Sequence, residues 1–254
     1  MDARAAFLSR EDALSRQSAI GLTLAGAICA AWLAVHVLLL FVLPLEWRLA
    51  PLLALLAAAQ TWLFVGLFIV AHDAMHGSLA PGHSRVNSAV GASLLFLYAG
   101  FDWRKLKGAH FEHHKKPGSP DDPDFCADHP NGFWRWYGAF LKRYFGLGSV
   151  LFVTGVFWFY HLAFGVSVEK MVLFYAVPSI ASSFQLFYFG TFRPHRHGGE
   201  RFADRHNARS DDFGTLASLA SCYHFGYHHE HHTQPNVPWW GLPAARRAAM
   251  ETSS

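Results

Sequence analysis

The histidines of this sequence are numerous, and their spacing is that of metal ligands carried on helices. Most of the 17 histidines among the 254 residues fall into short clusters. Side chains three or four residues apart share one face of a helix, so the members of each cluster would point the same way. Nine imidazoles can converge in this manner: His72, His76, His110, His113, His114, His195, His228, His231 and His232.

Nine imidazoles exceed the needs of a single metal ion. A zinc site takes about four protein ligands, or three and a water, so nine suit two metal ions with open positions for a substrate or oxygen. Cys29, Cys126 and Cys222 are too far apart for a CxxC motif, which disfavours iron–sulfur clusters and structural zinc. Imidazole binds iron, copper, nickel and zinc, so the ligand type leaves the metal open.

Two other interpretations of the histidines stay open. A single i,i+4 pair suits a hydrogen-bonded structural role as well as it suits ligation, although three clusters weaken that interpretation. The segment from His72 through Asp73 to His76 also resembles the H-E-x-x-H motif of zinc metalloproteases, with Asp in place of Glu. An intramembrane protease of this kind would leave seven of the nine histidines without a role.

Long intervals without charge predict the elements that must position these histidines. Asp, Glu, Lys and Arg are absent from residues 17–45 (29 residues), 49–72 (24), 144–168 (25) and 171–192 (22). Each interval exceeds the roughly 20 residues that a helix needs to cross hydrocarbon. A fifth interval, 86–101, has only 16 residues and several polar side chains. We therefore expect it to form a re-entrant or interfacial helix.

The basic residues predict the orientation of the four spans. With both termini inside, the outer loops carry only Arg48 and Lys170, and the other 19 of the 21 Lys and Arg lie on the inner side, as the positive-inside rule requires. All histidine clusters then emerge on that side. The sequence predicts an all-α integral membrane protein: four transmembrane helices, a re-entrant or interfacial helix, and a cytoplasmic histidine-rich helical cap.

Composition excludes several classes of protein. Only 15% of the residues are charged and 52% are apolar, whereas about 25% of a soluble domain is charged. A soluble enzyme and a disordered chain are therefore disfavoured. The formal net charge of +3 gives no electrostatic basis for a nucleic-acid partner. Without a repeat or a linker, residues 1–254 are predicted to form a single domain.

The boxes HDAMHGS (72–78), HFEHHKKPGSPDDPDF (110–125), RPHR (193–196) and FGYHHEHHTQPNVPWWGLP (225–243) resemble a known superfamily. It comprises the membrane-bound non-haem di-iron enzymes: fatty acid desaturases and hydroxylases, alkane hydroxylases and carotenoid oxygenases. Within it, the chain is similar to the bacterial β-carotene 4-ketolases, in which the third box runs directly into a segment like Asn-Val-Pro-Trp-Trp. The resemblance covers about residues 20–243.

This resemblance implies two iron ions held by the nine histidines, with O2 as a co-substrate. His195 stands alone ahead of the third box, and His197 and His224 are its rivals for the ninth ligand position. Side chains between or near the ligands in the sequence are candidates to orient the imidazole rings from outside the ligand set. These are Asp73, Glu112, Asp124, His224 and Glu230.

The resemblance also implies the reaction and the partners. The 4-position of a β-ionone ring would be hydroxylated twice and would then lose water, which converts β-carotene through echinenone to canthaxanthin. The carotenoid would come from the bilayer of a bacterial inner membrane. No GxGxxG fingerprint occurs in the sequence, so electrons would come from an external donor, a ferredoxin with its reductase. The sequence predicts neither the oligomeric state nor whether 3-hydroxylated rings react.

Overall fold

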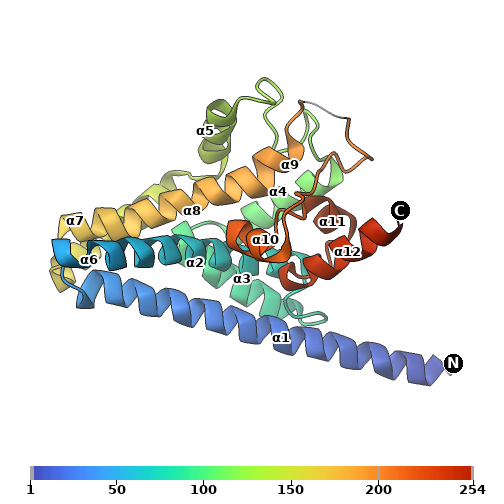
Figure 1. Ribbon diagram of the computed structural model, residues 1–254, viewed down its shortest axis with the longest axis horizontal. Helices are drawn as coiled ribbons and strands as arrows, with labels where there is room; N and C mark the ends of the chain where they lie inside the picture. The colour runs from blue at the N-terminus through green and yellow to red at the C-terminus, as the bar shows by residue number, and fades with distance from the viewer. Residues whose placement is uncertain (1–2, 199–200, 253–254) are drawn as a thin grey trace.

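The computed structural model of the protein is a bundle of long helices with a cluster of short helices at one end (Figure 1). The structure describes residues 3–198 and 201–252, and no strand occurs among them. Residues 1–2, 199–200 and 253–254 of the predicted single domain lie outside the described residues. The predicted all-α class is confirmed.

Four helices among the described residues are long and apolar enough to cross a membrane, as predicted. The first is α1 (Ala3–Val37), extended by the π-helical turn η1 (Leu38–Val42), and the second is α2 (Ala50–His76), preceded by the 3-10 turn η2 (Trp47–Leu49). The third is α6 (Leu147–Phe164). The fourth is one helical run made of α7 (Val168–Met171), η3 (Val172–Ala176), α8 (Val177–Phe187), η4 (Tyr188–Phe192) and α9 (Arg193–His195).

The span boundaries differ from those of the charge-free intervals, and two of the differences concern the third and fourth spans. The third span begins at Leu147 and not at 144, because Gly146 adopts an extended conformation that separates it from α5 (Phe133–Tyr144). The fourth continues beyond Phe192, so that Arg193 and His195 lie in its last turn. A charge thus marks where a helix leaves the apolar layer, while hydrogen bonding of the backbone decides where the helix itself ends.

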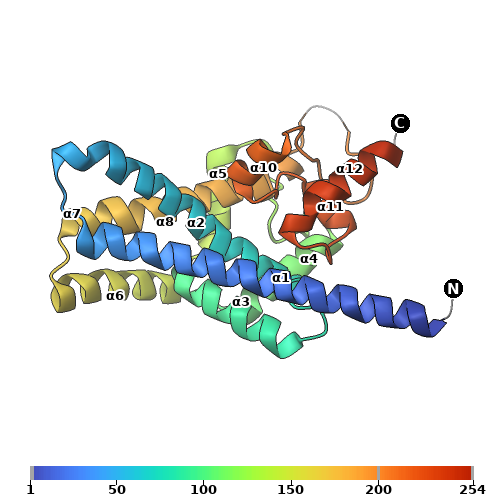
Figure 2. The ribbon, with the colours of Figure 1, turned by 60° about the horizontal axis from the view of Figure 1, so that its bottom comes forward.

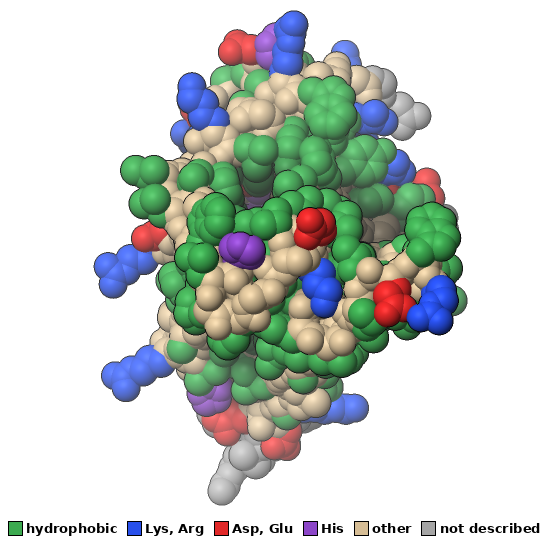
Figure 3. All heavy atoms as spheres, turned by 90° about the vertical axis from the view of Figure 1, so that its left-hand side faces the viewer, with side chains coloured by type: hydrophobic (Ala, Val, Ile, Leu, Met, Phe, Trp, Pro, Cys, Tyr) green, Lys and Arg blue, Asp and Glu red, His purple; other side chains and the backbone are tan. Residues whose placement is uncertain are grey.

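Both termini lie at the same end of the bundle (Figure 1). The opposite end holds the connections from α1 to α2 and from α6 to α7. Seen from that end, the molecule shows mainly hydrophobic side chains with scattered charges (Figure 3). Leu147 and Leu162 of α6 are 74% and 76% exposed. Apolar side chains this exposed need a lipid environment, because in water their exposure would be unfavourable.

Helices α3 (Ser84–Ala99) and α4 (Trp103–Lys115) form a hairpin beside α2. The chain leaves α2 at the histidine-bearing end, runs back along the bundle as α3 (Figure 2), and turns at Gly100. Gly100 has φ +65°, and a Cβ there would come within 2.6 Å of Phe152, so glycine is required. The last turn of α4 then meets the last turn of α2. The predicted re-entrant or interfacial helix is α3, the first arm of this hairpin. The start of α3 and the end of α4 both lie at the histidine-bearing end of the bundle.

The remaining helices cover the end of the bundle that carries the termini. They are α10 (Thr215–Cys222), α11 (His228–Thr233), the 3-10 turn η5 (Trp239–Gly241) and α12 (Leu242–Thr252). Helix α5 lies apart from this group and packs Trp136 and Tyr137 against Phe187 and Phe192 of the fourth span. The histidines thus have a cap of short helices on one side and the long apolar helices on the other.

A close approach between α1 and the loop after α2 gives a test of the bundle. A Cβ on Gly21 would come within 2.4 Å of the Leu79 carbonyl oxygen, whereas a Cβ on Gly26 would meet nothing within 4 Å. We expect Gly21→Ala to lower stability by about 1–3 kcal/mol because backbone must move. Gly26→Ala is the matched control and should keep or raise stability, since alanine favours helix. Thermal unfolding of both variants in detergent measures the difference, and equal midpoints would contradict the packing.

Candidate metal centre

All nine predicted histidines lie together, and the helix ends explain why. Each histidine box occupies the last turn of a helix or a short helix of its own: α2, α4, α9 and α11. They form two groups of side chains whose ligand atoms lie within 4.8 Å of one another. The "His72 group" consists of His72, His76, His110, His114 and His231, and the "His195 group" consists of His113, His195, His228 and His232.

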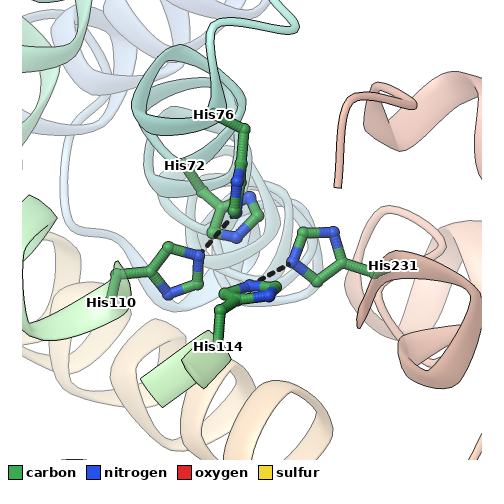
Figure 4. Close-up of side chains that lie close together, drawn as sticks. All are labelled: His72, His76, His110, His114 and His231. Carbon is green, nitrogen blue, oxygen red and sulfur yellow. Dashed lines mark hydrogen bonds between the residues drawn. The ribbon is translucent and has the colours of Figure 1, made fainter. Parts of the chain in front are cut away.

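The rings of the His72 group point toward a common centre (Figure 4). Nε2 of His76 lies 2.7 Å from Nε2 of His110, and Nε2 of His114 lies 3.0 Å from Nε2 of His231. His72 is buried between these pairs, and neither of its ring nitrogens has a hydrogen-bond partner among the described residues. A buried polar atom without a partner is unfavourable unless something else binds it.

The His195 group repeats this arrangement beside the first. Nε2 of His228 lies 3.0 Å from Nε2 of His195 and 3.1 Å from Nε2 of His232. Nε2 of His113 lies 3.2 Å from Nε2 of His232. All four side chains are buried. Helix α4 contributes His113 to this group and His110 and His114 to the other. A single helix therefore joins the two groups.

The separations between these nitrogens fit ligation by a metal ion. Two nitrogens bound to one ion at 2.0–2.1 Å lie about 2.9 Å apart when their bonds are at right angles, and about 3.4 Å apart in a tetrahedron. The separations given above run from 2.7 to 3.2 Å. Without a proton or a cation between them, two facing lone pairs at this distance repel each other. The residues present therefore fit two metal ions, one in each group.

The electrostatic environment keeps most of these rings neutral. Burial, and then the neighbouring histidines, hold the pKa values of His110, His231 and His232 well below the usual value for histidine. A neutral imidazole has a free lone pair on one nitrogen and can bind a metal ion. Desolvation makes protonation of these rings unfavourable. Their lone pairs therefore stay free to bind a metal ion.

His113 is the exception, because a carboxylate holds its outer nitrogen. Burial lowers its pKa, but the hydrogen bond with Asp122 and the charges of Asp124 and Asp122 outweigh burial and raise it. Nδ1 of His113 lies 2.9 Å from both carboxylate oxygens of Asp122. Asp122 also accepts hydrogen bonds from the backbone N–H groups of Gly118 and Asp124. A carboxylate behind a ligating histidine fixes the orientation of the ring.

The carboxylate in this position is Asp122, whereas the sequence analysis named Asp124. Asp124 accepts a hydrogen bond from the Tyr144 hydroxyl, and its nearest oxygen lies 4.0 Å from Nδ1 of His113. The sequence could have placed a partner for His113 only somewhere in the run of four aspartates at 121–128. The turn that follows α4, with Gly118 at φ +64°, decides which carboxylate faces the ring.

His195 joins the metal groups, and its two rivals do not. Nδ1 of His195 lies 2.8 Å from the carbonyl oxygen of Asn207, which leaves Nε2 directed at His228. Nε2 of His197 lies 3.0 Å from the Gly118 carbonyl oxygen, outside both groups. His224 is also outside them, and its ring stacks on those of Tyr227 and Trp239. The continuous helix through η4 and α9 carries His195 to this place, which spacing alone could not predict.

Asp73 fastens the C-terminal segment to α2 and does not bond to an imidazole. Its carboxylate accepts a hydrogen bond of 3.0 Å from the backbone N–H of Trp239, and lies 3.8 Å from Nδ1 of His72. The metalloprotease interpretation required this carboxylate to act as a base. With Asp73 engaged by Trp239 and all nine histidines gathered, that interpretation is disfavoured.

The two glutamates that were candidates to orient imidazoles also bond elsewhere. Glu112 is exposed and pairs with Lys115 at 2.6 Å, because on α4 it points away from the ligating face. Glu230 is buried, but it accepts hydrogen bonds from Ser210 and from Arg246, the latter at 3.0 Å. It thereby ties α11 to α12 and to the preceding loop.

A pocket of about 900 Å³, including its open mouth, leads to the histidines from the side of the bundle. Four ligand candidates form part of its wall: His72, His110, His113 and His228. The rest of the wall is mainly apolar and comes from α2, α3, α4, α5 and the fourth span. Its polar side chains besides the histidines are those of Tyr98, Asp124, Tyr144, Ser183 and Thr191. The pocket therefore suits a hydrophobic molecule that presents one end to both histidine groups.

Comparison with known proteins places the chain in a family. Residues 45–156 and 143–253 match the fatty acid desaturase family, and the chain belongs to this family. A β-carotene ketolase of Paracoccus sp. (strain PC1) is 46% identical over 240 residues, which cover 94% of this chain and 97% of the relative. A second, from Paracoccus sp. (strain N81106 / MBIC 01143), is 49% identical over 231 residues, 90% and 93% of the two chains.

More distant relatives carry a related name. A zeaxanthin 4-ketolase of Chlamydomonas reinhardtii is 36% identical over 90% of this chain, which spans 54% of that relative. No solved structure matches the chain. The resemblance that rested on the histidine boxes is thus confirmed by similarity over most of the sequence.

The contact between His113 and Asp122 gives a test of the site. Asp122→Asn keeps the shape of the side chain but removes the charge that orients the ring, so we expect metal affinity to fall about 10–100-fold. Asp121→Asn is the matched control, because the Asp121 side chain is 74% exposed and pairs with Lys116 on the surface. Metal content after dialysis against a graded series of chelator concentrations measures the change. Equal retention in both variants would show that Asp122 does not support the site.

Proposed function

We propose that this protein is a carotenoid 4-ketolase that introduces a keto group at the 4-position of β-ionone rings. The observation that carries the proposal is the meeting of two histidine groups at the end of a mainly apolar pocket. That site lies in a chain 46–49% identical to two β-carotene ketolases over most of both lengths. The zeaxanthin 4-ketolase relative supports 3-hydroxylated rings as additional substrates.

The nine histidines would hold two iron ions, with O2 as the co-substrate. Iron at these positions would supply the reduction of O2 and the oxidation of the C–H bond, which amino-acid side chains cannot perform. The chain itself keeps most of the imidazoles neutral by burial, and it orients His113 through Asp122 and His195 through Asn207. Asp73 holds the Trp239 segment in place beside the His72 group.

The pocket would bind one end of the carotenoid while the polyene stays in lipid. A hydrocarbon of this kind partitions into the bilayer, so lateral access between helices is the expected route. The carbon at position 4 is next to the ring double bond, which weakens its C–H bonds. Two hydroxylations at this carbon followed by loss of water give the ketone, and repetition on the second ring converts β-carotene through echinenone to canthaxanthin. Zeaxanthin would give astaxanthin in the same way.

We infer that the protein lies in a bacterial inner membrane with its termini and histidines on the cytoplasmic side. The distribution of Lys and Arg supports this orientation, because all but Arg48 and Lys170 belong to the side of the termini. Electrons would come from a ferredoxin and its reductase. The Lys and Arg residues of α4 and the loop after it offer a basic surface to an acidic donor. Residues 1–254 would act as one domain.

Pigment analysis tests the proposal directly. Expression in a bacterial host that makes β-carotene should yield echinenone and canthaxanthin, detected by chromatography of extracts. His72→Ala and His232→Ala each remove a ligand candidate from one group. Each should lower the yield of ketones by at least about 100-fold. His129→Ala is the matched control, since this histidine contacts Arg135 outside both groups, and it should leave the products unchanged.

The same experiment has outcomes against the proposal. Absence of ketones from cells that contain the intact protein in the membrane would overturn it. A desaturated or hydroxylated lipid as the product would instead identify a different di-iron oxygenase of the same family.

A further inference from the structure

Three side chains of types that can ligate a metal ion lie outside the two histidine groups but next to one of them. They are Asp204 and His206, in the loop before α10, and His229 of α11. One oxygen of Asp204 accepts a hydrogen bond of 2.9 Å from Nε2 of His229, and the other accepts one of 2.8 Å from the backbone N–H of His206. The ring centroids of His206 and His229 are 6.3 Å apart. One carboxylate thus contacts the ring of His229 and the backbone of His206, and the two rings lie near each other.

This cluster joins the protein surface to the buried site. The Asp204 side chain is 39% exposed and that of His229 is 28% exposed. The His206 ring centroid lies 6.2 Å from that of His232, a buried member of the His195 group. Imidazoles and a carboxylate therefore continue from solvent to the edge of the His195 group.

The loop that carries Asp204 and His206 is held in a defined position. The Ser210 hydroxyl oxygen accepts a hydrogen bond of 3.0 Å from the backbone N–H of His229. The same hydroxyl donates to the buried carboxylate of Glu230. Asn207 fixes the other part of the loop, since its carbonyl oxygen bonds to His195 and its amide donates to the carbonyl oxygen of Pro117. The loop thus stays over the His195 group although it has no regular secondary structure.

A metal ion needs a polar route to this site. The apolar pocket is a poor one, because a hydrated divalent cation loses its water there and gains few ligands in return. Asp204, His206 and His229 are not part of the pocket wall, so they reach the histidines from another side. A carboxylate attracts the cation from solvent, and imidazoles can replace its water in steps. Ligands that are widely spaced and partly exposed bind an ion weakly. Weak binding suits a route, because the ion must leave it for the histidine groups.

We propose that Asp204, His229 and His206 form the route by which ferrous ion passes from the aqueous phase to the two histidine groups. The inference rests on the proposed use of iron. The ion stays in the ferrous state throughout and only exchanges ligands. Asp204 meets the hydrated ion first, the two imidazoles follow, and His206 transfers it toward His232. The nine histidines set the final affinity, and the route sets the rate of loading.

The rate of iron uptake tests this route. The full-length protein in detergent is stripped with a chelator and mixed anaerobically with micromolar ferrous ion. Uptake is stopped with excess chelator at successive times, and bound iron is assayed. We expect Asp204→Asn and His206→Asn each to slow uptake about tenfold, the lower end of what focused charge does to association rates. The final iron content at saturating ferrous ion should equal that of the unaltered protein.

His83→Asn is the matched control, because His83 is exposed ahead of α3, at the same end of the molecule. It should load at the unaltered rate. Unchanged rates in both route variants would overturn the inference, and so would equal slowing in the control. A lower final iron content would also overturn it, since the residues would then be ligands.

Failure of the route and failure of the proposed function can be told apart. Iron uptake needs no carotenoid, so a protein that loads iron by this route but makes no ketone leaves the inference standing and overturns the ketolase proposal. If the unaltered protein binds no ferrous ion, both the use of iron and the route are wrong.

Discussion

Eight of the nine imidazoles have a ring nitrogen about 3 Å from a nitrogen of another ring, and these buried contacts are the constraint on which this structure depends. Two lone pairs facing each other at this distance are unfavourable, and burial makes relief by protonation costly. Helix packing must therefore hold the rings in place. Under the proposed binding of two metal ions, the cations would compensate this cost, and metal binding would be coupled to the stability of this end of the bundle.

Helix ends are well suited to meet that constraint. A residue in the last turn of a helix is placed by all the packing that precedes it, so the long apolar spans position His76 and His195 rigidly. Supporting contacts then orient single rings, as Asp122 does for His113 and the Asn207 carbonyl for His195. The hairpin of α3 and α4 has a further role, because it returns the second box to the side from which the chain left α2.

The two histidine groups are approached from two sides with opposite character. The pocket reaches them through apolar walls from the membrane part of the bundle, where a hydrocarbon is soluble. The loop with Asp204 and His206 lies beside the His195 group at the polar end. On the proposed route an ion would enter there from water, whereas a hydrocarbon would enter through the pocket from lipid. Each would then stay in the medium in which its free energy is low until it meets the site.

The sequence by itself determined the number of spans, the short fifth helix and the nine histidines of the site, because charge-free length and i,i+4 spacing are local properties. It also determined the family through its boxes. Only the tertiary structure decided which carboxylate faces His113, since Asp121, Asp122 and Asp124 look alike until the turn at Gly118 is formed. The division of the histidines into two groups, and the exclusion of Glu112, likewise depend on how helices distant in sequence are rotated against each other. Local patterns fix which side chains share a face, but the contact between faces is a property of the packed bundle.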